Sequence, residues 1–287
     1  MRVLVTGVKG QLGHDVVKHL SSQGVANRGV DMEDFDLTDE KQVMDYVTSY
    51  DPDVIVHCAA YTAVDKAEND VVNCMRVNGQ GTVNLVRAAT EVHAALLYIS
   101  TDYVFDGEGE TPFETGMTVC PRNVYGLSKL QGELAVRGQM KRYFIIRTSW
   151  VYGLNGKNFV RTMLRLGREN STVRVVNDQI GSPTYSDDLA ALICEMIGTK
   201  RYGVYHATNE GFCSWAEFAE AIMKEAGLHC KVIPVPTTEY PTPARRPHNS
   251  RLSKASLDKE GFARLPQWQD ALTRYLRELR AEENGER

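Results

Sequence analysis

The stretch that decides the fold is "VLVTGVKGQLGHDVVKHL", residues 3–20, in which an apolar run meets three glycines and then a helical pattern. Gly7, Gly10 and Gly13 lie between a predicted strand at 2–6 and a predicted helix at 11–23. Glycines at this spacing permit a tight turn and close approach of the backbone to a pyrophosphate, and the helix N-terminus attracts anions. The pattern favours a dinucleotide-binding loop, although the three glycines alone also fit a merely tight strand-to-helix turn.

Strands and helices alternate along the first half of the chain beyond this loop. The predicted strands are nearly continuous apolar runs, as expected for a parallel sheet that is covered on both faces. They lie at 53–59, 95–100 and 143–149, with a weakly signalled strand near 25–31 that is placed by spacing, and predicted helices cover 73–92 and 128–138. This alternation predicts the α/β class, with a doubly wound Rossmann-type parallel sheet.

Predicted strands and helices alternate less regularly after residue 150. We interpret this part as a smaller C-terminal region that binds the substrate. We therefore expect a dinucleotide-binding domain over 1–150 and a mainly substrate-binding region over 151–287, with segments at about 173–208 returning to the Rossmann sheet. A loop is expected over 234–250, which holds five of the ten prolines, and the charged end at 280–287 is expected to fray.

Composition excludes several classes of function. The 287 residues carry a formal charge of −4, which gives no long-range attraction to nucleic acid or to an anionic membrane. No apolar stretch is long enough for a transmembrane helix, and no signal segment precedes the first strand, so we expect a cytoplasmic protein. Six scattered cysteines without a C-x-x-C pair predict reduced, buried thiols and no metal site.

An acidic residue near the end of the second predicted strand bears on the choice of cofactor. Asp31 lies 18 positions after Gly13, about where a carboxylate would meet the ribose 2′-hydroxyl of NAD. Arg28 lies close by and weakens this argument for NAD. Asp31 also stands among other acids, so it fits an ordinary loop acid as well. Both NADPH and NADH remain open as cofactors.

Three further residues suggest a site for carbonyl chemistry. Tyr125 and Lys129 are four apart in a predicted helix, so they share a face, and a nearby ammonium lowers a tyrosine pKa towards the range of a general acid. Such a pair arises by chance in roughly every second chain of this composition. Thr101 ends a predicted central strand, where ligands bind in open α/β sheets, and would add a second hydroxyl for a developing alkoxide. A capped turn is the alternative for "STDYVF".

Together these motifs resemble the extended short-chain dehydrogenase/reductase family. The residues that carry the resemblance are the three glycines, "HCAAYTAVDKAE" (57–68), Asn78, "STDYVFDG" (100–107) and "PRNVYGLSK" (121–129). Longer strings at 147–153, 158–164, 175–184 and 240–253 resemble, within that family, the reductases that act last in dTDP-L-rhamnose synthesis. The resemblance covers almost the whole chain.

The resemblance implies NADPH- or NADH-dependent reduction of the C4 ketone of dTDP-4-dehydro-β-L-rhamnose. It implies that Tyr125 is the general acid, assisted by Lys129 and Thr101. The expected cofactor contacts are Gly7, Gly10, Gln11, Leu12, Asp31, Asp36, Leu37, Ala59, Ala60, Tyr61, Ser100, Tyr125 and Lys129. The expected contacts to the dTDP-sugar are Val64, Thr101, Asp102, Tyr103, Tyr125, Trp150, Asn158 and Arg246.

Other activities of similar chains are less well matched. A sugar-nucleotide 4,6-dehydratase would carry Asp-Glu after the threonine, whereas here Thr101 is followed by Asp102 and Tyr103. A 4-epimerase would use the same Tyr and Lys, and no local motif argues against it. A non-catalytic regulatory or sensor subunit on the same fold is a further alternative, although the intact catalytic set and Trp150 favour an enzyme. A homodimer is possible.

Overall fold

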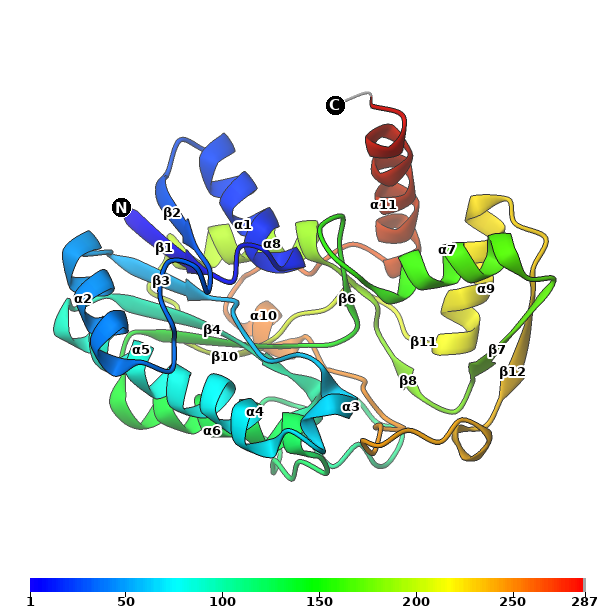
Figure 1. Ribbon diagram of the computed structural model, residues 1–287, viewed down its shortest axis with the longest axis horizontal. Helices are drawn as coiled ribbons and strands as arrows, with labels where there is room; N and C mark the ends of the chain where they lie inside the picture. The colour runs from blue at the N-terminus through cyan, green and yellow to red at the C-terminus, as the bar shows by residue number, and fades with distance from the viewer. Residues whose placement is uncertain (286–287) are drawn as a thin grey trace.

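Six parallel strands form the central sheet in the order β10-β5-β4-β3-β1-β2 (Figure 1). The structure is a computed structural model that describes residues 1–285. The strands are β1 (Arg2–Thr6), β2 (Ala26–Val30), β3 (Val54–His57), β4 (Ala95–Thr101), β5 (Tyr143–Thr148) and β10 (Gly203–His206). The order reverses beside β1, so the predicted doubly wound parallel sheet is confirmed.

Burial explains which strands the sequence signals clearly. All four residues of β3 are buried, and β4 is buried at all but one position, because helices cover both faces of these central strands. In β2, at the edge of the sheet, Val30 alone is buried. Its apolar signal is weak because little of its surface is removed from water.

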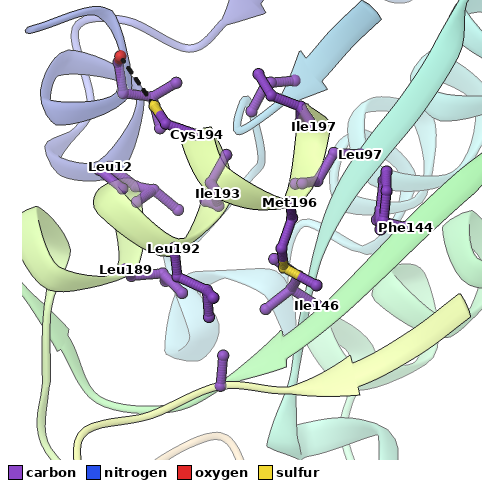
Figure 2. Packing of buried hydrophobic residues seen from close by; sticks show 14 of the residues in the cluster. Leu12, Leu97, Phe144, Ile146, Leu189, Leu192, Ile193, Cys194, Met196 and Ile197 are labelled. Atoms are coloured by element: carbon purple, nitrogen blue, oxygen red, sulfur yellow. Dashed lines mark hydrogen bonds between the residues drawn. The ribbon is translucent and has the colours of Figure 1, made fainter. Parts of the chain in front are cut away.

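Helices cover the two faces of the sheet. On one face, α1 (Gln11–Ser22) packs against α8 (Ser186–Ile197), and Figure 2 shows Leu189, Ile193 and Met196 of α8 in the core with Leu97 and Ile146 of the sheet. The other face carries α2 (Glu40–Tyr50), α5 (Gly81–Glu91) and α6 (Val124–Gln139).

The helix predicted over 73–92 is interrupted. It consists of α4 (Val71–Met75), a π-helical turn η1 (Arg76–Gln80) and α5. Within the turn, Gly79 lies against the side chain of Gln131, where a Cβ atom would come within 2.0 Å of Oε1. The wide turn thus lies at a close helix–helix contact, and π-helical turns are often found at functional sites.

A second lobe is built largely from residues after β5 and has its own aromatic core. Its helices are α7 (Phe159–Glu169), α9 (Trp215–Ala226) and α11 (Trp268–Glu283). Its strands form three short pairs: β6 (Val151–Tyr152) with β9 (Thr184–Tyr185), β7 (Thr172–Val176) with β12 (Lys231–Val235), and β8 (Ile180–Gly181) with β11 (Cys213–Ser214). Within 173–208, β7 belongs to this lobe, whereas α8 and β10 belong to the layers of the central sheet.

Four short segments complete the described chain. They are α3 (Val64–Ala67), the 3₁₀ turns η2 (Asp102–Val104) and η3 (Thr237–Glu239), and α10 (Ala255–Lys259). η3 interrupts the expected loop at 234–250. In the charged end at 280–287, α11 continues to Glu283, and residues 286–287 lie outside the described part of the chain.

The cysteines are free thiols, and four of the six are buried. Cys58 is partly buried and Cys120 is exposed, so the expectation that all six are buried is wrong. Cys120 lies in the loop between η2 and α6, outside any packed element. Over residues 1–285, no helix is long and apolar enough to cross a membrane, and no group of three or more His, Cys, Asp and Glu side chains is placed to hold a metal ion.

Candidate active site

A cavity of about 630 Å³ lies at the carboxyl edge of the central sheet. The ends of β1, β2, β3 and β4 contribute to its lining, together with the first turn of α6 and residues at the start of the second lobe. Of the residues predicted from the sequence, the lining includes Gly7, Gly10, Gln11, Leu12, Asp31, Asp36, Leu37, Ala59, Ala60, Val64, Ser100, Thr101, Asp102, Tyr103, Tyr125, Lys129 and Trp150.

The glycine loop is shaped by close backbone contacts. Gly7 has a positive φ of 74°, and a Cβ atom on it would lie 2.6 Å from the backbone nitrogen of Ala59. A Cβ atom on Gly13 would lie 2.3 Å from the carbonyl oxygen of Gly7. No side chain caps the N-terminus of α1 at Gly10, and Gly10, Gln11 and Leu12 line the cavity. The loop therefore fits the anionic pyrophosphate of a dinucleotide.

Asp31 is held in place at the end of β2. Its Oδ2 accepts a hydrogen bond from the Lys9 backbone nitrogen at 2.9 Å, and its Oδ1 accepts one from the Met32 nitrogen at 2.9 Å. The Lys9 ammonium pairs with Glu33. A carboxylate so fixed beside the glycine loop is placed to accept a hydrogen bond from a ribose hydroxyl.

A buried polar network supports the strand ends next to the loop. The Thr6 hydroxyl lies 2.8 Å from Nδ1 of His57 and accepts a hydrogen bond from the Ala59 nitrogen at 3.2 Å. Burial lowers the pKa of His57 to about 3, so this imidazole is neutral. The Asn78 side chain binds both the backbone nitrogen and the carbonyl oxygen of Tyr61, at 2.7 and 3.0 Å. The Tyr61 hydroxyl is directed to Asp70 at 3.0 Å, and Tyr61 is not among the lining residues.

Tyr125 enters the cavity from the first turn of α6. Asn123 caps this helix through a 2.8 Å hydrogen bond from the Gly126 nitrogen, and a Cβ atom on Gly126 would lie 2.2 Å from the Tyr103 carbonyl oxygen. The helix therefore approaches η2 closely, which brings the Tyr125 and Tyr103 rings to 5.6 Å at an angle of 79°.

The pKa of Tyr125 is raised above its ordinary value, mainly by burial and further by the nearby Asp102 carboxylate, while a hydrogen bond with Thr101 lowers it. The expected lowering by Lys129 is thus wrong, because burial of the phenol dominates. Tyr125 is protonated at neutral pH, the form that a proton donor requires.

Lys129 lies one turn further along α6 and is buried, with Nζ 4.2 Å from the centroid of the Tyr98 ring. Burial lowers its pKa to about 7, and Glu133 acts in the opposite direction. The proton on this amine is therefore held weakly in the physiological range.

Thr101 and Asp102 follow one another at the end of β4. The Thr101 hydroxyl donates to Asp102 Oδ1 at 2.9 Å and accepts from the Tyr103 nitrogen at 3.2 Å. Burial raises the pKa of Asp102 to about 6, and the Ser250 hydroxyl offsets part of that effect. Over residues 1–285, Asp102 Oδ2 accepts no hydrogen bond of ordinary geometry.

Two stacked indoles form the wall of the second lobe. Trp150 has a φ of 50°, unusual for a non-glycine residue, and its ring lies 3.7 Å from that of Trp215 with 15° between their planes. Gly181 allows this packing, because a Cβ atom there would come within 2.9 Å of the Trp150 ring. Sequence reasoning missed Trp215. The capping box around Ser214 marks the start of its helix but gives no sign of the stacking.

A loop of the second lobe lies across the glycine loop. Asn155 donates from Nδ2 to the carbonyl oxygen of Lys9 at 2.8 Å, and Asn155, Gly156 and Lys157 line the cavity. These residues were also not predicted. Their polar and small side chains are typical of any loop, and their position depends on how the two lobes meet.

Two predicted substrate residues lie outside the cavity lining. Asn158 caps α7 by accepting from the Arg161 nitrogen at 3.0 Å, and it donates to the Gly153 carbonyl oxygen at 2.7 Å. Arg246 pairs with Asp65 at 2.5 Å and donates to the Tyr103 hydroxyl at 3.0 Å. Arg246 therefore lies behind Tyr103, one residue away from the cavity.

A glycine loop at the first parallel strand, a Tyr-x-x-x-Lys pair and a strand-end threonine around one cavity define an α/β protein of the extended short-chain dehydrogenase/reductase class. The model of the RmlD substrate binding domain matches residues 1–281. The chain belongs to this RmlD family.

Relatives and solved structures match almost the whole chain. Spore coat polysaccharide biosynthesis protein SpsK of Bacillus subtilis (strain 168) is 40% identical over 277 residues, which cover 96% of this chain and 97% of that protein. The crystal structure of a dTDP-4-dehydrorhamnose reductase from Clostridium acetobutylicum is 40% identical with a TM-score of 0.96, covering 98% of this chain and 100% of that one. The dTDP-4-dehydrorhamnose reductase of Bacillus anthracis in complex with NADP is 42% identical with a TM-score of 0.94, covering 96% and 99%.

Proposed function

We propose that the protein is a dTDP-4-dehydrorhamnose reductase that uses NADPH or NADH to reduce the C4 ketone of dTDP-4-dehydro-β-L-rhamnose to dTDP-β-L-rhamnose. The observation that carries the proposal is the gathering of Thr101, Tyr125 and Lys129 around the cavity that the glycine loop borders. Two solved relatives at 40% and 42% identity bear this enzyme's name, and one of them was solved with NADP.

The cavity fits a dinucleotide along its β1 side. We assign the pyrophosphate to the amides of Gly7, Gly10, Gln11 and Leu12, where the helix dipole favours negative charge. We assign the adenosine ribose to Asp31, with Asp36 and Leu37 beside it, and the middle of the dinucleotide to Ala59 and Ala60. Bound in this orientation, NADPH or NADH supplies a hydride to the ketone carbon. We assign Tyr61 an indirect role, because it lies outside the cavity lining and its backbone, which Asn78 holds, follows directly after Ala60.

The catalytic residues act on the ketone oxygen. Tyr125, kept protonated by burial, gives its proton to the C4 oxygen as negative charge develops there. Thr101 hydrogen bonds the same oxygen, as an oxyanion donor does. Lys129 carries the positive charge that offsets the phenolate formed on Tyr125 and hydrogen bonds the nicotinamide ribose. Ser100, next to Thr101 at the end of β4, lines the same cavity.

The second lobe holds most of the sugar nucleotide. We place the deoxysugar between Trp150 and the residues Val64 of α3 and Asp102 and Tyr103 of η2, which line the same cavity. Residues after 150 receive the thymidine diphosphate, with Arg246 and Asn158 supporting that end. This division assigns residues 1–150 mainly to the cofactor and 151–287 mainly to the substrate.

The test is a reduction assay that follows loss of the reduced nicotinamide absorbance. A small panel of 4-keto-6-deoxy sugar nucleotides is offered with NADPH and with NADH, and the expected result is turnover of the dTDP-rhamnose precursor. Tyr125→Phe should lower kcat by several orders of magnitude while leaving cofactor affinity largely intact. Tyr202→Phe is the matched control, because its hydroxyl contacts Arg142 outside the cavity. Near-normal turnover of Tyr125→Phe at saturating substrate would exclude it as the acid.

The six free thiols support a reducing compartment, and we place the enzyme in the cytoplasm. The possible homodimer stays a prediction, which sedimentation equilibrium tests directly.

A further inference from the structure

A buried charged cluster lies directly behind the cavity and has no part in the chemistry described above. Glu133 on α6 is 0% exposed and Arg147 on β5 is 1% exposed. Glu133 accepts hydrogen bonds from Arg147 Nε at 2.8 Å, from Arg147 Nη2 at 2.7 Å and from the Ser100 hydroxyl at 2.5 Å. Arg147 also donates to the carbonyl oxygen of Thr115 at 3.2 Å. Both oxygens of the Glu133 carboxylate are thus held by hydrogen bonds from β4 and β5.

The cluster reaches the cavity through its neighbours. Ser100 and Lys129 line the cavity, whereas Glu133 and Arg147 do not. Lys129 and Glu133 are one turn apart on α6, so they share a face of the helix. Paired strand positions place Ser100 opposite Arg147 in the sheet. One carboxylate therefore connects a catalytic lysine to the strand end that carries Thr101.

Few charged groups surround the Lys129 amine. The titratable groups that face it from the elements packed around it are Tyr125 and Glu133 of α6, Tyr98 of β4, His57 and Cys58 at the end of β3, and Cys74 of α4. Burial keeps His57 neutral, since it lowers that pKa to about 3, and keeps Cys58 protonated, since it raises that pKa to about 12. Among these groups, Glu133 has the largest effect on the Lys129 pKa in the direction opposite to burial.

Stability does not account for such a cluster. A buried ion pair gains little over apolar side chains of similar volume, because both charges lose their hydration. A function that needs a negative charge at this position explains its presence more directly.

We propose that Glu133, fixed by Arg147 and Ser100, is a positioning residue that raises the protonated fraction of the Lys129 amine at neutral pH and thereby sets the alkaline limit of the reaction. The inference rests on the proposed function, in which the protonated form of Lys129 is the active one.

The direction of the effect follows from the charges. Burial holds the pKa of Lys129 near 7, and Glu133 raises it against burial. Removing the negative charge lowers this pKa further, so the amine loses its proton at a lower pH. Activity that needs the ammonium is lost as pH rises through that pKa, so the alkaline limb of the pH–rate profile moves to lower pH, by about one unit or more.

Two variants separate this effect from damage to the fold. Glu133→Gln keeps the size of the side chain but leaves Arg147 as an unpaired buried cation, which destabilises the fold. The double variant Glu133→Gln/Arg147→Met removes both charges and restores a neutral interior. Both should move the alkaline limb of kcat/KM in the acidic direction. Asp15→Asn is the matched control, because Asp15 is a buried carboxylate bonded to Ser186 on the other face of the sheet and should leave the limb in place.

A second measurement needs no turnover. The rate at which acetic anhydride acetylates Lys129 in the full chain, read by mass spectrometry over a pH series, reports the neutral fraction of the amine. The half-maximal rate should move to lower pH in the double variant and not in Asp15→Asn. If the wild type reduces the keto-sugar but neither the rate limb nor the acetylation midpoint moves, the role of Glu133 is refuted while the proposed function stands. If the wild type has no reductase activity, the function fails, and the acetylation midpoint alone decides the role of Glu133.

Discussion

Replacing Asp102 with Asn should raise the free energy of unfolding at neutral pH. This gain should disappear in acid. In the folded chain burial raises the pKa of Asp102 from 3.8 to about 6, so ionising this carboxylate opposes folding. The folded state binds more protons between these two values, and stability therefore falls as pH rises through that window. A shift of about 2 units corresponds to roughly 3 kcal/mol. The penalty is complete above about pH 6 and absent below about pH 4.

The Asn side chain keeps the oxygen that accepts the Thr101 hydroxyl and removes the charge. Thermal melts of the wild type and of Asp102→Asn at about pH 7.5 should differ by up to about 6 °C, at roughly 2 °C per kcal/mol for a chain of this size. The same pair of melts near pH 4 measures any effect of the new amide that does not depend on pH, and this value is subtracted from the difference at pH 7.5. If the melting temperatures of the two proteins differ by the same amount at pH 7.5 and at pH 4, burial does not raise the pKa of Asp102.

Three other substitutions test other parts of the site. Thr101→Val should cost roughly 2–4 kcal/mol of transition-state stabilisation, seen as a fall in kcat, and a loss confined to KM would contradict its role at the ketone oxygen. Gly13→Ala should abolish dinucleotide binding in a fluorescence titration, because its Cβ atom would lie 2.3 Å from the Gly7 carbonyl oxygen, and normal affinity would mean that the loop adapts. Trp215→Ala should raise KM for the sugar nucleotide about threefold to tenfold and leave KM for NADPH unchanged, because it removes the stacking that holds Trp150.

The fold could be predicted wherever a short-range pattern matched the final environment. Gly7 and Gly13 lie where backbone atoms approach too closely for a side chain, so their identity encodes the turn directly. β3 and β4 are buried on both faces and appear in the sequence as apolar runs. The π-helical turn η1 was not foreseen; it lies where Gly79 contacts Gln131 of another helix, a contact that no spacing in the sequence encodes.

Site residues could be predicted where they lie at the end of one strand or the start of one helix. Residues that reach the cavity through packing of the second lobe were missed. Thr101, Tyr125 and Lys129 occupy the end of one strand and the start of one helix, and topology brings these elements to the same edge. Trp215 and the loop around Asn155 reach the cavity through packing of the second lobe, which no spacing in the sequence encodes. The pKa of Tyr125 was predicted in the wrong direction, because a count of neighbouring charges omits the effect of burial.

Because α8 and β10 return to the layers of the central sheet, the two lobes cannot be separated at one point of the chain. A chain that ended after β5 would leave β5 as an unpaired edge strand, which is prone to aggregation. It would also expose Leu12, Val16 and Leu20 of α1, which α8 covers in the full chain. A single crossover near residue 150 would therefore also replace α8 and β10, and the incoming elements would have to fit α1 and β5 of the first part. An exchange confined to the second lobe would have to leave both of these elements in place, since they complete the sheet and cover of the first part.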